Sequence, residues 1–165
     1  MTLNLESNGL SGSIPHDLCF RHPKLEYLNL ENNQFHGQIP SGISHCSAMD
    51  TLDLAGNKFT GNVLDNIGNM SRLLILQLGR NNFYGKIPPE LGKLPILEGV
   101  FLQANQFTGE IPPELGQSSS IGRLYIKNNK ITGEIPPSIF NISTLRELGL
   151  SENQLSGNVP SFGES

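Results

Sequence analysis

Apolar residues recur along this chain of 165 residues at one fixed interval of 24 positions. In a frame that begins at Leu25, the fourth and sixth positions of each copy are apolar, as in "YLNL" at residues 27–30. Alternation of this kind predicts a short strand with one buried face. Further copies begin at Met49, Leu73, Leu97, Ile121 and Leu145, and residues 1–24 fit the frame with one extra residue between residues 19 and 24. Short units that agree this closely predict a solenoid, in which each coil packs against its neighbours.

Three other features of the frame hold one residue type in nearly every copy. Position 9 is always Asn, position 13 is always Gly, and position 15 is Ile or Val, followed by Pro except at Leu64. An Asn amide can satisfy backbone groups at a bend, Gly permits a turn that a Cβ would block, and Pro denies a donor to a continuing ladder. At Leu64 we expect a local change in the outer wall. We expect a ladder of stacked asparagines along the solenoid: Asn8, Asn33, Asn57, Asn81, Asn105, Asn129 and Asn153.

The combined motif N-x-[FLI]-x-G-x-[IV]-P resembles plant-type extracellular leucine-rich repeats, as in the ectodomains of receptor-like kinases and receptor-like proteins. It is also similar to the repeats of polygalacturonase-inhibiting proteins. The resemblance covers essentially residues 1–165 as a single array of about seven 24-residue repeats. It implies an α/β-type repeat solenoid, a curved right-handed superhelix with a parallel β-sheet on the concave face and a mostly irregular and 3-10 outer wall.

The same resemblance implies a function. It favours non-catalytic recognition of a peptide or protein ligand, together with a leucine-rich-repeat co-receptor, by the extracellular part of a plant cell-surface receptor. The parent protein would then lie at the plasma membrane with this segment outside the cell. Two alternatives stay open: a secreted protein similar to polygalacturonase inhibitors, and a structural or co-receptor scaffold.

The exposed positions of the concave face would be 3, 5, 7, 8 and 10 of the frame, and they differ between the two halves of the chain. The first half offers mostly acidic groups (Glu6, Glu31, Asp53) and Asn32. In the second half, Phe101 and Tyr125 share position 5 in adjacent coils, about 5 Å apart. An aromatic pair beside cations is an anchor for an acidic group or a C-terminal carboxylate. The predicted ligand-binding residues are Arg80, Phe101, Arg123, Tyr125 and Lys127.

The alternative interpretation of this face is a solvated sheet surface whose side chains pair for their own stability. Some peptide-hormone receptors of the resembled family carry an Arg-x-Arg pair here. This chain has Arg123-x-Tyr125-x-Lys127 instead, so that role does not transfer directly.

Two sequons and two cysteines are the remaining candidate modification sites. Asn69 and Asn141 each begin an Asn-x-Ser sequon at position 21, on the outer wall, where a glycan could project. Cys46 occupies position 22, where other copies have large apolar residues, and this favours a buried thiol. A Cys19–Cys46 disulfide between adjacent coils is the other reading.

Composition excludes several classes of function. The formal net charge is −4 without a block of like charges, so we expect no nucleic-acid partner. No apolar run reaches about 18 residues, so we expect no membrane insertion from this segment. The four His lack ligand spacing, and no phosphate loop, kinase signature or GxSxG motif occurs. We therefore expect no metal, no cofactor and no catalysis, with a serine/threonine kinase only in a longer parent chain.

The two ends of the sequence also carry an expectation. The first residues, "MTLNLESNGL", lack the basic and apolar regions of a secretory signal. Both ends fall within the repeat and show no capping unit. We therefore expect this chain to be a fragment of a receptor ectodomain.

Overall fold

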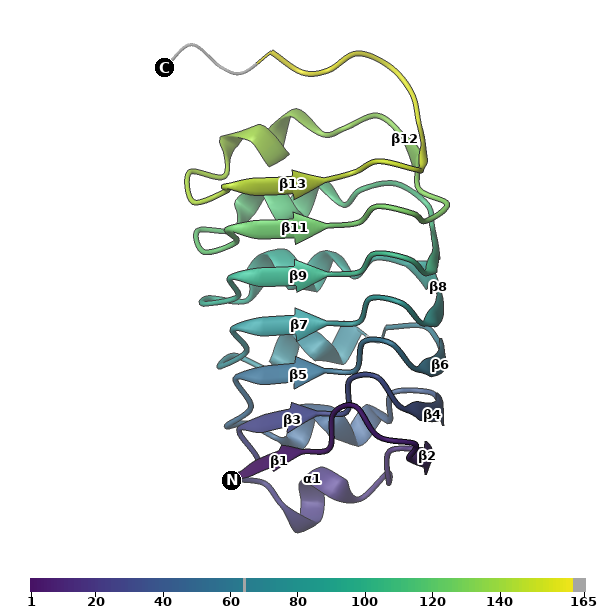
Figure 1. Cartoon of the computed structure of the whole chain (residues 1–165). Helices are drawn as coiled ribbons and strands as arrows, with labels where there is room; N and C mark the ends of the chain where they lie inside the picture. Colours follow the sequence, from purple (N-terminus) through teal and green to yellow (C-terminus); the bar gives the residue numbers. More distant parts are fainter. Residues whose placement is uncertain (64, 162–165) are drawn as a thin grey trace.

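A computed structural model describes residues 1–63 and 65–161, and in that part the coils stack into a solenoid with one main parallel sheet (Figure 1). The sheet has seven strands there: β1 (Thr2–Asn4), β3 (Tyr27–Asn29), β5 (Thr51–Asp53), β7 (Ile75–Gln77), β9 (Gly99–Phe101), β11 (Arg123–Tyr125) and β13 (Glu147–Gly149). Partners occupy the same frame position, as Leu28 and Leu52 do. The solenoid with a parallel sheet that the sequence predicts is confirmed.

A second parallel sheet runs along one side of the solenoid, and the repeat pattern did not predict it. It joins β2 (Ser11–Gly12), β4 (Gln34–Gly37), β6 (Lys58–Gly61), β8 (Asn82–Lys86) and β10 (Gln106–Thr108), and a separate pair joins β12 (Thr132–Gly133) to β14 (Gln154–Leu155). The glycine of frame position 13 lies in or beside these strands, with φ from 78° to 106° in its seven copies. Only glycine adopts such angles without strain, which explains why this position never varies.

The outer wall is built from single 3-10 turns. These are η1 (Ser41–His45), η2 (Asp65–Asn69), η3 (Pro89–Lys93), η4 (Pro113–Gln117) and η5 (Pro137–Asn141). Proline begins three of them, because its fixed φ suits the first turn of a helix. The first coil differs: its extra residue is accommodated in an α-helical turn, α1 (Leu18–Arg21). Leu64 lies outside the described residues.

The core is one continuous column of apolar side chains along the solenoid axis. Position 11 contributes a stack of phenylalanines whose ring centroids are 6.3 to 6.4 Å apart: Phe35, Phe59, Phe83 and Phe107. The last three are completely buried, and so are Leu52, Leu76 and Leu124 of position 4. Truncating such a Phe costs roughly 3–5 kcal/mol. This column holds the strands in register and so fixes the spacing of the face opposite it.

The asparagine ladder works through the backbone. The Asn57 amide donates to the carbonyl oxygens of Leu30, Leu54 and Ala55 at 2.8–3.2 Å, and its Oδ1 accepts from the N–H of Phe35 at 3.0 Å. Each Asn thus satisfies groups of its own coil and of the preceding one, without a direct Asn–Asn bond. Asn8 makes only the two bonds within its own coil.

The expectation of a buried free thiol at Cys46 is wrong. Cys19 and Cys46 form a disulfide between the first two coils, with Cα atoms 4.9 Å apart. The extra residue of the first coil and its helical turn place Cys19 over Cys46, and both are fully buried. The alternative interpretation, a disulfide between adjacent coils, is the correct one, although the two cysteines are 27 residues apart and so do not occupy equivalent positions of the 24-residue frame.

Candidate ligand-binding face

Side chains of frame positions 3 and 5 project from the main sheet on the side opposite the core, because successive residues of a strand alternate between its faces. The column at position 5 changes character along the axis. Its first part is polar and its last part carries two aromatic rings and a glycine: Asn4, Asn29, Asp53, Gln77, Phe101, Tyr125 and Gly149. The face therefore has two chemically distinct halves on one regular backbone.

Three residues of β9 and β11 form what we call the aromatic shelf: Phe101, Arg123 and Tyr125. The Phe101 and Tyr125 rings are stacked, with centroids 5.6 Å apart and planes inclined by 15°. The Arg123 guanidinium carbon lies 5.3 Å from the centroid of the Phe101 ring, a cation–π arrangement. The structure thus brings together three of the five residues predicted from the sequence.

Two glycines set the tilt of the rings, and the sequence reasoning did not identify them. A Cβ added at Gly99 would lie 2.7 Å from Cε2 of Phe101, and one added at Gly149 would lie 2.7 Å from Cδ1 of Tyr125. The rings therefore recline over strand positions that lack side chains. A glycine one strand away from an aromatic residue in the same column was the available signal for Gly149.

Glu147 orients Tyr125 and was also missed. The Tyr125 hydroxyl donates a hydrogen bond to the Glu147 carboxylate. This bond, with some burial and the negative charge of Glu147, raises the pKa of Tyr125 above its ordinary value. The hydroxyl is thereby held as a proton donor, and the ring is fixed in one orientation.

The two other predicted residues lie apart from the shelf contacts. Lys127 is exposed, and its ammonium group has no hydrogen bond or ion pair within the described ranges 1–63 and 65–161. It remains available to a ligand. Arg80 belongs instead to the first half of the face, where it is already paired.

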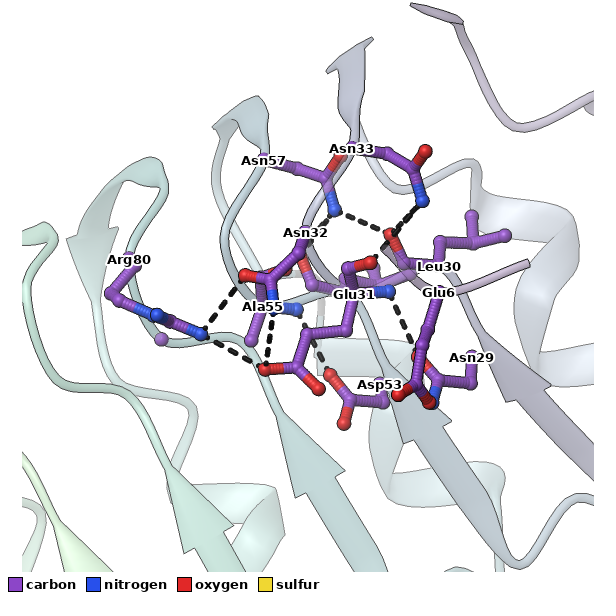
Figure 2. Close-up of polar contacts among 12 residues, drawn as sticks. Glu6, Asn29, Leu30, Glu31, Asn32, Asn33, Asp53, Ala55, Asn57 and Arg80 are labelled. Carbon is purple, nitrogen blue, oxygen red and sulfur yellow. Dashed lines mark hydrogen bonds and ion pairs between the residues drawn. The ribbon is translucent and has the colours of Figure 1, made fainter. Parts of the chain in front are cut away.

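Arg80 forms part of a network that we call the N-terminal polar network: Glu6, Asn29, Glu31, Asp53 and Arg80 (Figure 2). Arg80 Nη2 lies 2.9 Å from Glu31 Oε1 and 3.2 Å from Asn32 Oδ1, two coils away. It reaches them across Gly56, where a Cβ would lie 2.4 Å from Asn32 Oδ1 and 3.4 Å from Arg80 Nη2. The missing side chain opens the path for this ion pair.

The carboxylates of this network are held by the chain itself. Asn29 Nδ2 donates to Glu6 at 2.7 Å, and the N–H of Ala55 donates to Asp53 at 3.0 Å. Burial raises the pKa of Asp53 to about 6, and the charges of Glu31 and Glu6 add to the shift, whereas the Ala55 bond and Arg80 oppose it. The first half of the face therefore satisfies most of its own charge.

Outside the concave face, the predicted modification sites lie on the outer wall. Asn69 and Asn141 are both exposed at the ends of η2 and η5. Within residues 1–63 and 65–161, no group of three or more His, Cys, Asp or Glu side chains is arranged to hold a metal ion. Among the helices of those ranges, none has the length and apolar character to cross a membrane.

Comparison with protein-family models identifies the family of this chain. One described as "Leucine rich repeat" matches residues 1–59, and a second of the same description matches residues 49–70, 72–94, 120–142 and 144–164. These segments cover most of the sequence, so the chain belongs to the leucine-rich-repeat family. A comparison with curated proteins gave no match.

Comparison with solved structures shows which leucine-rich-repeat proteins this chain resembles. The chain is 39% identical to the ectodomain of the Arabidopsis thaliana membrane receptor kinase GASSHO1/SCHENGEN3, solved with CASPARIAN STRIP INTEGRITY FACTOR 2; the TM-score is 0.92 over 95% of this chain and 19% of that one. It is 34% identical to the Arabidopsis receptor kinase HAESA, solved with the peptide hormone IDA and the co-receptor SERK1, with a TM-score of 0.92 over 96% of this chain and 26% of that one.

The chain thus spans about a fifth to a quarter of these receptor structures. A plant ice-binding protein is also similar, at 30% identity and a TM-score of 0.89 over 95% of this chain and 51% of that one. The fold is therefore that of plant leucine-rich-repeat ectodomains, and the site has to carry the argument for function.

Proposed function

We propose that this chain recognises a peptide through the second half of its concave face, as part of the extracellular domain of a plant cell-surface receptor. The observation that carries the proposal is the aromatic shelf with its cations. Phe101 and Tyr125 present rigid, half-buried rings, and Arg123 and Lys127 present guanidinium and ammonium groups that no carboxylate of the described chain neutralises. Aromatic and arginine side chains of this kind contribute most to binding at protein interfaces.

The chemistry of the shelf indicates the class of ligand group. Its rings take an apolar or planar side chain, and its cations take a carboxylate of a side chain or a C-terminus. Seven strands spaced by about 4.8 Å make a sheet roughly 30 Å long, which matches an extended peptide of about nine residues. In this proposal the whole chain acts as one repeat array that supports that length.

Receptors of similar fold support the proposal of a peptide ligand. HAESA is a receptor kinase solved with a peptide hormone and a co-receptor. By analogy we propose a peptide ligand and a leucine-rich-repeat co-receptor for this chain, with the segment outside the plasma membrane and signalling left to other parts of a parent protein. The analogy is one of fold and of family, and Arg80, paired with Glu31, is not included in the proposed site.

A secreted location would also make the two sequons functional. We propose glycans at Asn69 and Asn141, whose side chains are exposed on the outer wall, away from the shelf. Mass spectrometry of tryptic peptides from the chain expressed through a plant secretory pathway checks this. Unmodified peptides at both positions would contradict it.

A selection from displayed random peptides of about twelve residues tests the proposed binding face. The full chain is the bait, with Phe101→Ala/Tyr125→Ala as the binding-face variant and Glu6→Gln/Glu31→Gln as a matched control in the other half. We expect peptides that the wild-type chain enriches to be lost on the shelf variant and retained on the control. Recovery of the same peptides on the shelf variant, or of none that depend on the shelf, would overturn the proposal.

A further inference from the structure

A separate open pocket of about 650 Å³ lies where the turns of three adjacent coils enter β9, β11 and β13. Pro95 and Ile96 form an apolar wall, and Ile96 is 42% exposed. The pocket adjoins the aromatic shelf, because it is lined by Arg123, which belongs to the shelf, and by Glu147, which accepts the hydrogen bond of Tyr125. None of the residues predicted from the sequence, apart from Arg123, marks it.

Gly122 forms the floor of this pocket, which we call the Gly122 pocket. A Cβ at this position would meet only the carbonyl oxygens of Thr144 at 3.5 Å and Glu98 at 3.8 Å, which are ordinary contacts. Its φ is not in the left-handed region. Neither packing nor backbone conformation therefore requires glycine here, although glycine costs conformational entropy. Its effect is to leave an open space between the flanking coils.

The polar groups around the floor differ in how far the chain satisfies them. Ser120 and Thr144 donate their hydroxyl protons to the carbonyl oxygens of Leu97 and Ile121, at 2.9 and 2.8 Å. They present only lone pairs to the pocket. The Arg123 and Glu147 side chains are engaged by the two rings of the shelf.

Glu98 and Arg146 are the two other charged residues that line the pocket. They occupy the same frame position as Gly122, one coil before it and one coil after it. Across the described residues, neither side chain has a hydrogen bond or ion pair. Their Cα atoms are separated by two strand spacings, about 9.6 Å. A free carboxylate and a free guanidinium thus line the pocket on either side of Gly122.

We infer that the Gly122 pocket is a second subsite, which binds an extended peptide segment carrying a basic and an acidic side chain two residues apart. The basic side chain pairs with Glu98, the acidic one with Arg146, and the main chain between them lies over Gly122. Side chains two residues apart on a strand are about 6.8 Å apart, and their length spans the remaining distance. This inference rests on the proposed function, since it assigns another part of the same peptide.

The test uses an acetylated and amidated peptide, Ala-Ala-Lys-Ala-Asp-Ala, titrated into the isotope-labelled full chain while the amide signal of Gly122 is followed by NMR. We expect a saturable shift with the wild-type chain. In Gly122→Leu we expect no shift of the amide at position 122 or of the amides beside it. The Glu98→Arg and Arg146→Glu variants should each lower affinity about fivefold. The double exchange Glu98→Arg/Arg146→Glu should restore binding, because the peptide can then lie in the opposite direction.

Controls separate charge recognition from unspecific contact and from the shelf. A neutral peptide with Gln and Asn in place of Lys and Asp should leave the Gly122 signal unchanged. Equal shifts with that peptide, or unchanged affinity in both single charge variants, would overturn the inference. If Gly122→Leu fails to fold by circular dichroism, the charge exchange still decides.

The probe contains no aromatic residue for the shelf rings, and the Gly122 amide reports contact within the pocket. If no selected peptide depends on the shelf but the probe still shifts the Gly122 signal, the proposed shelf site is wrong. If selected peptides depend on the shelf but the probe does not shift that signal, the inference about the Gly122 pocket is wrong.

Discussion

The two halves of the concave face share one backbone and differ in what they leave for a partner. In the first half, Glu31 and Arg80 neutralise each other and Glu6 is held by Asn29. In the second half, the rings of Phe101 and Tyr125 are partly exposed and Lys127 is unpaired among the described residues. The same frame positions thus build a self-satisfied surface in one place and an available one in another.

This contrast shows where the information for function lies in a repeat protein. Core positions and the Asn ladder are nearly identical in every coil, so they set the spacing and carry no specificity. Specificity depends on the exposed positions, including those at which a side chain is missing. Gly56 permits an internal ion pair, whereas Gly122 leaves a pocket open.

The largest expected effect is common to both halves, because they share the ladder. Asn57→Ala and Asn105→Ala each remove three donated bonds and one accepted bond at buried sites. We expect each to lower the free energy of unfolding by about 4 kcal/mol, against about 1 kcal/mol for Asn8→Ala at the edge. Urea denaturation measures these values, and a small effect at Asn105 alone would show that the two halves are held together differently.

Removal of the disulfide should affect the two halves of the solenoid differently. Replacing Cys19 and Cys46 by Ser removes a cross-link that closes a sequence separation of 27 residues, which should cost about 3 kcal/mol. Because each coil packs mainly against its immediate neighbours, we expect faster hydrogen exchange in the first two coils and unchanged exchange around Phe101. Equal acceleration throughout the chain would instead indicate that the solenoid unfolds as one unit.

Asp53 offers a pH test of the first half. The pKa of Asp53 is raised from 3.8 to about 6 in the folded chain, so its ionised form destabilises the fold. This penalty is present above about pH 6 and disappears as the pH falls below about 4. Asp53→Asn should therefore stabilise the chain at neutral pH by less than about 1 kcal/mol, after solvent screening, and change nothing near pH 3.5. Destabilisation at neutral pH would mean that the carboxylate is a net contributor.

The smallest effect concerns the ion pair itself. Arg80→Ala breaks an exposed pair with Glu31 and should change stability by no more than about 0.5 kcal/mol. It should still move the pKa of Asp53 further upward, because Arg80 lowers that pKa in the wild-type chain. NMR titration of the Asp53 carboxyl carbon detects this shift. A downward shift would contradict the described network.

Much of the fold was predictable from the sequence, because the period alone places the strands, the buried Leu columns and the position-13 turns. The second sheet was not predictable in this way: it arises from backbone groups of residues 11–12, 34–37 and their equivalents. Their exposed and buried side chains alternate over only two to five residues, which is too short to distinguish a strand from the turn at position 13. The disulfide was only the alternative interpretation, because it depends on one inserted residue near Cys19, which shifts that coil against the next.

The face was predictable in part. Stacking of Phe101 on Tyr125 follows from their shared frame position, and Gly149 shares the same column, but the role of Glu147 is seen only in its contact across strands. Arg80 was grouped with the shelf by its charge, whereas its long side chain reaches back two coils to Glu31. Sequence position fixes the column of a residue, and the direction of a flexible side chain is decided by its partners.

The most direct test of the central claim is a calorimetric titration of one selected peptide into three forms of the chain. They are the wild type, Phe101→Ala/Tyr125→Ala in the second half, and Glu31→Gln/Asp53→Asn in the first. The account predicts at least a tenfold loss of affinity in the second-half variant and less than about a twofold change in the first-half variant. A first-half variant that loses as much affinity as the second-half variant, or more, would contradict it.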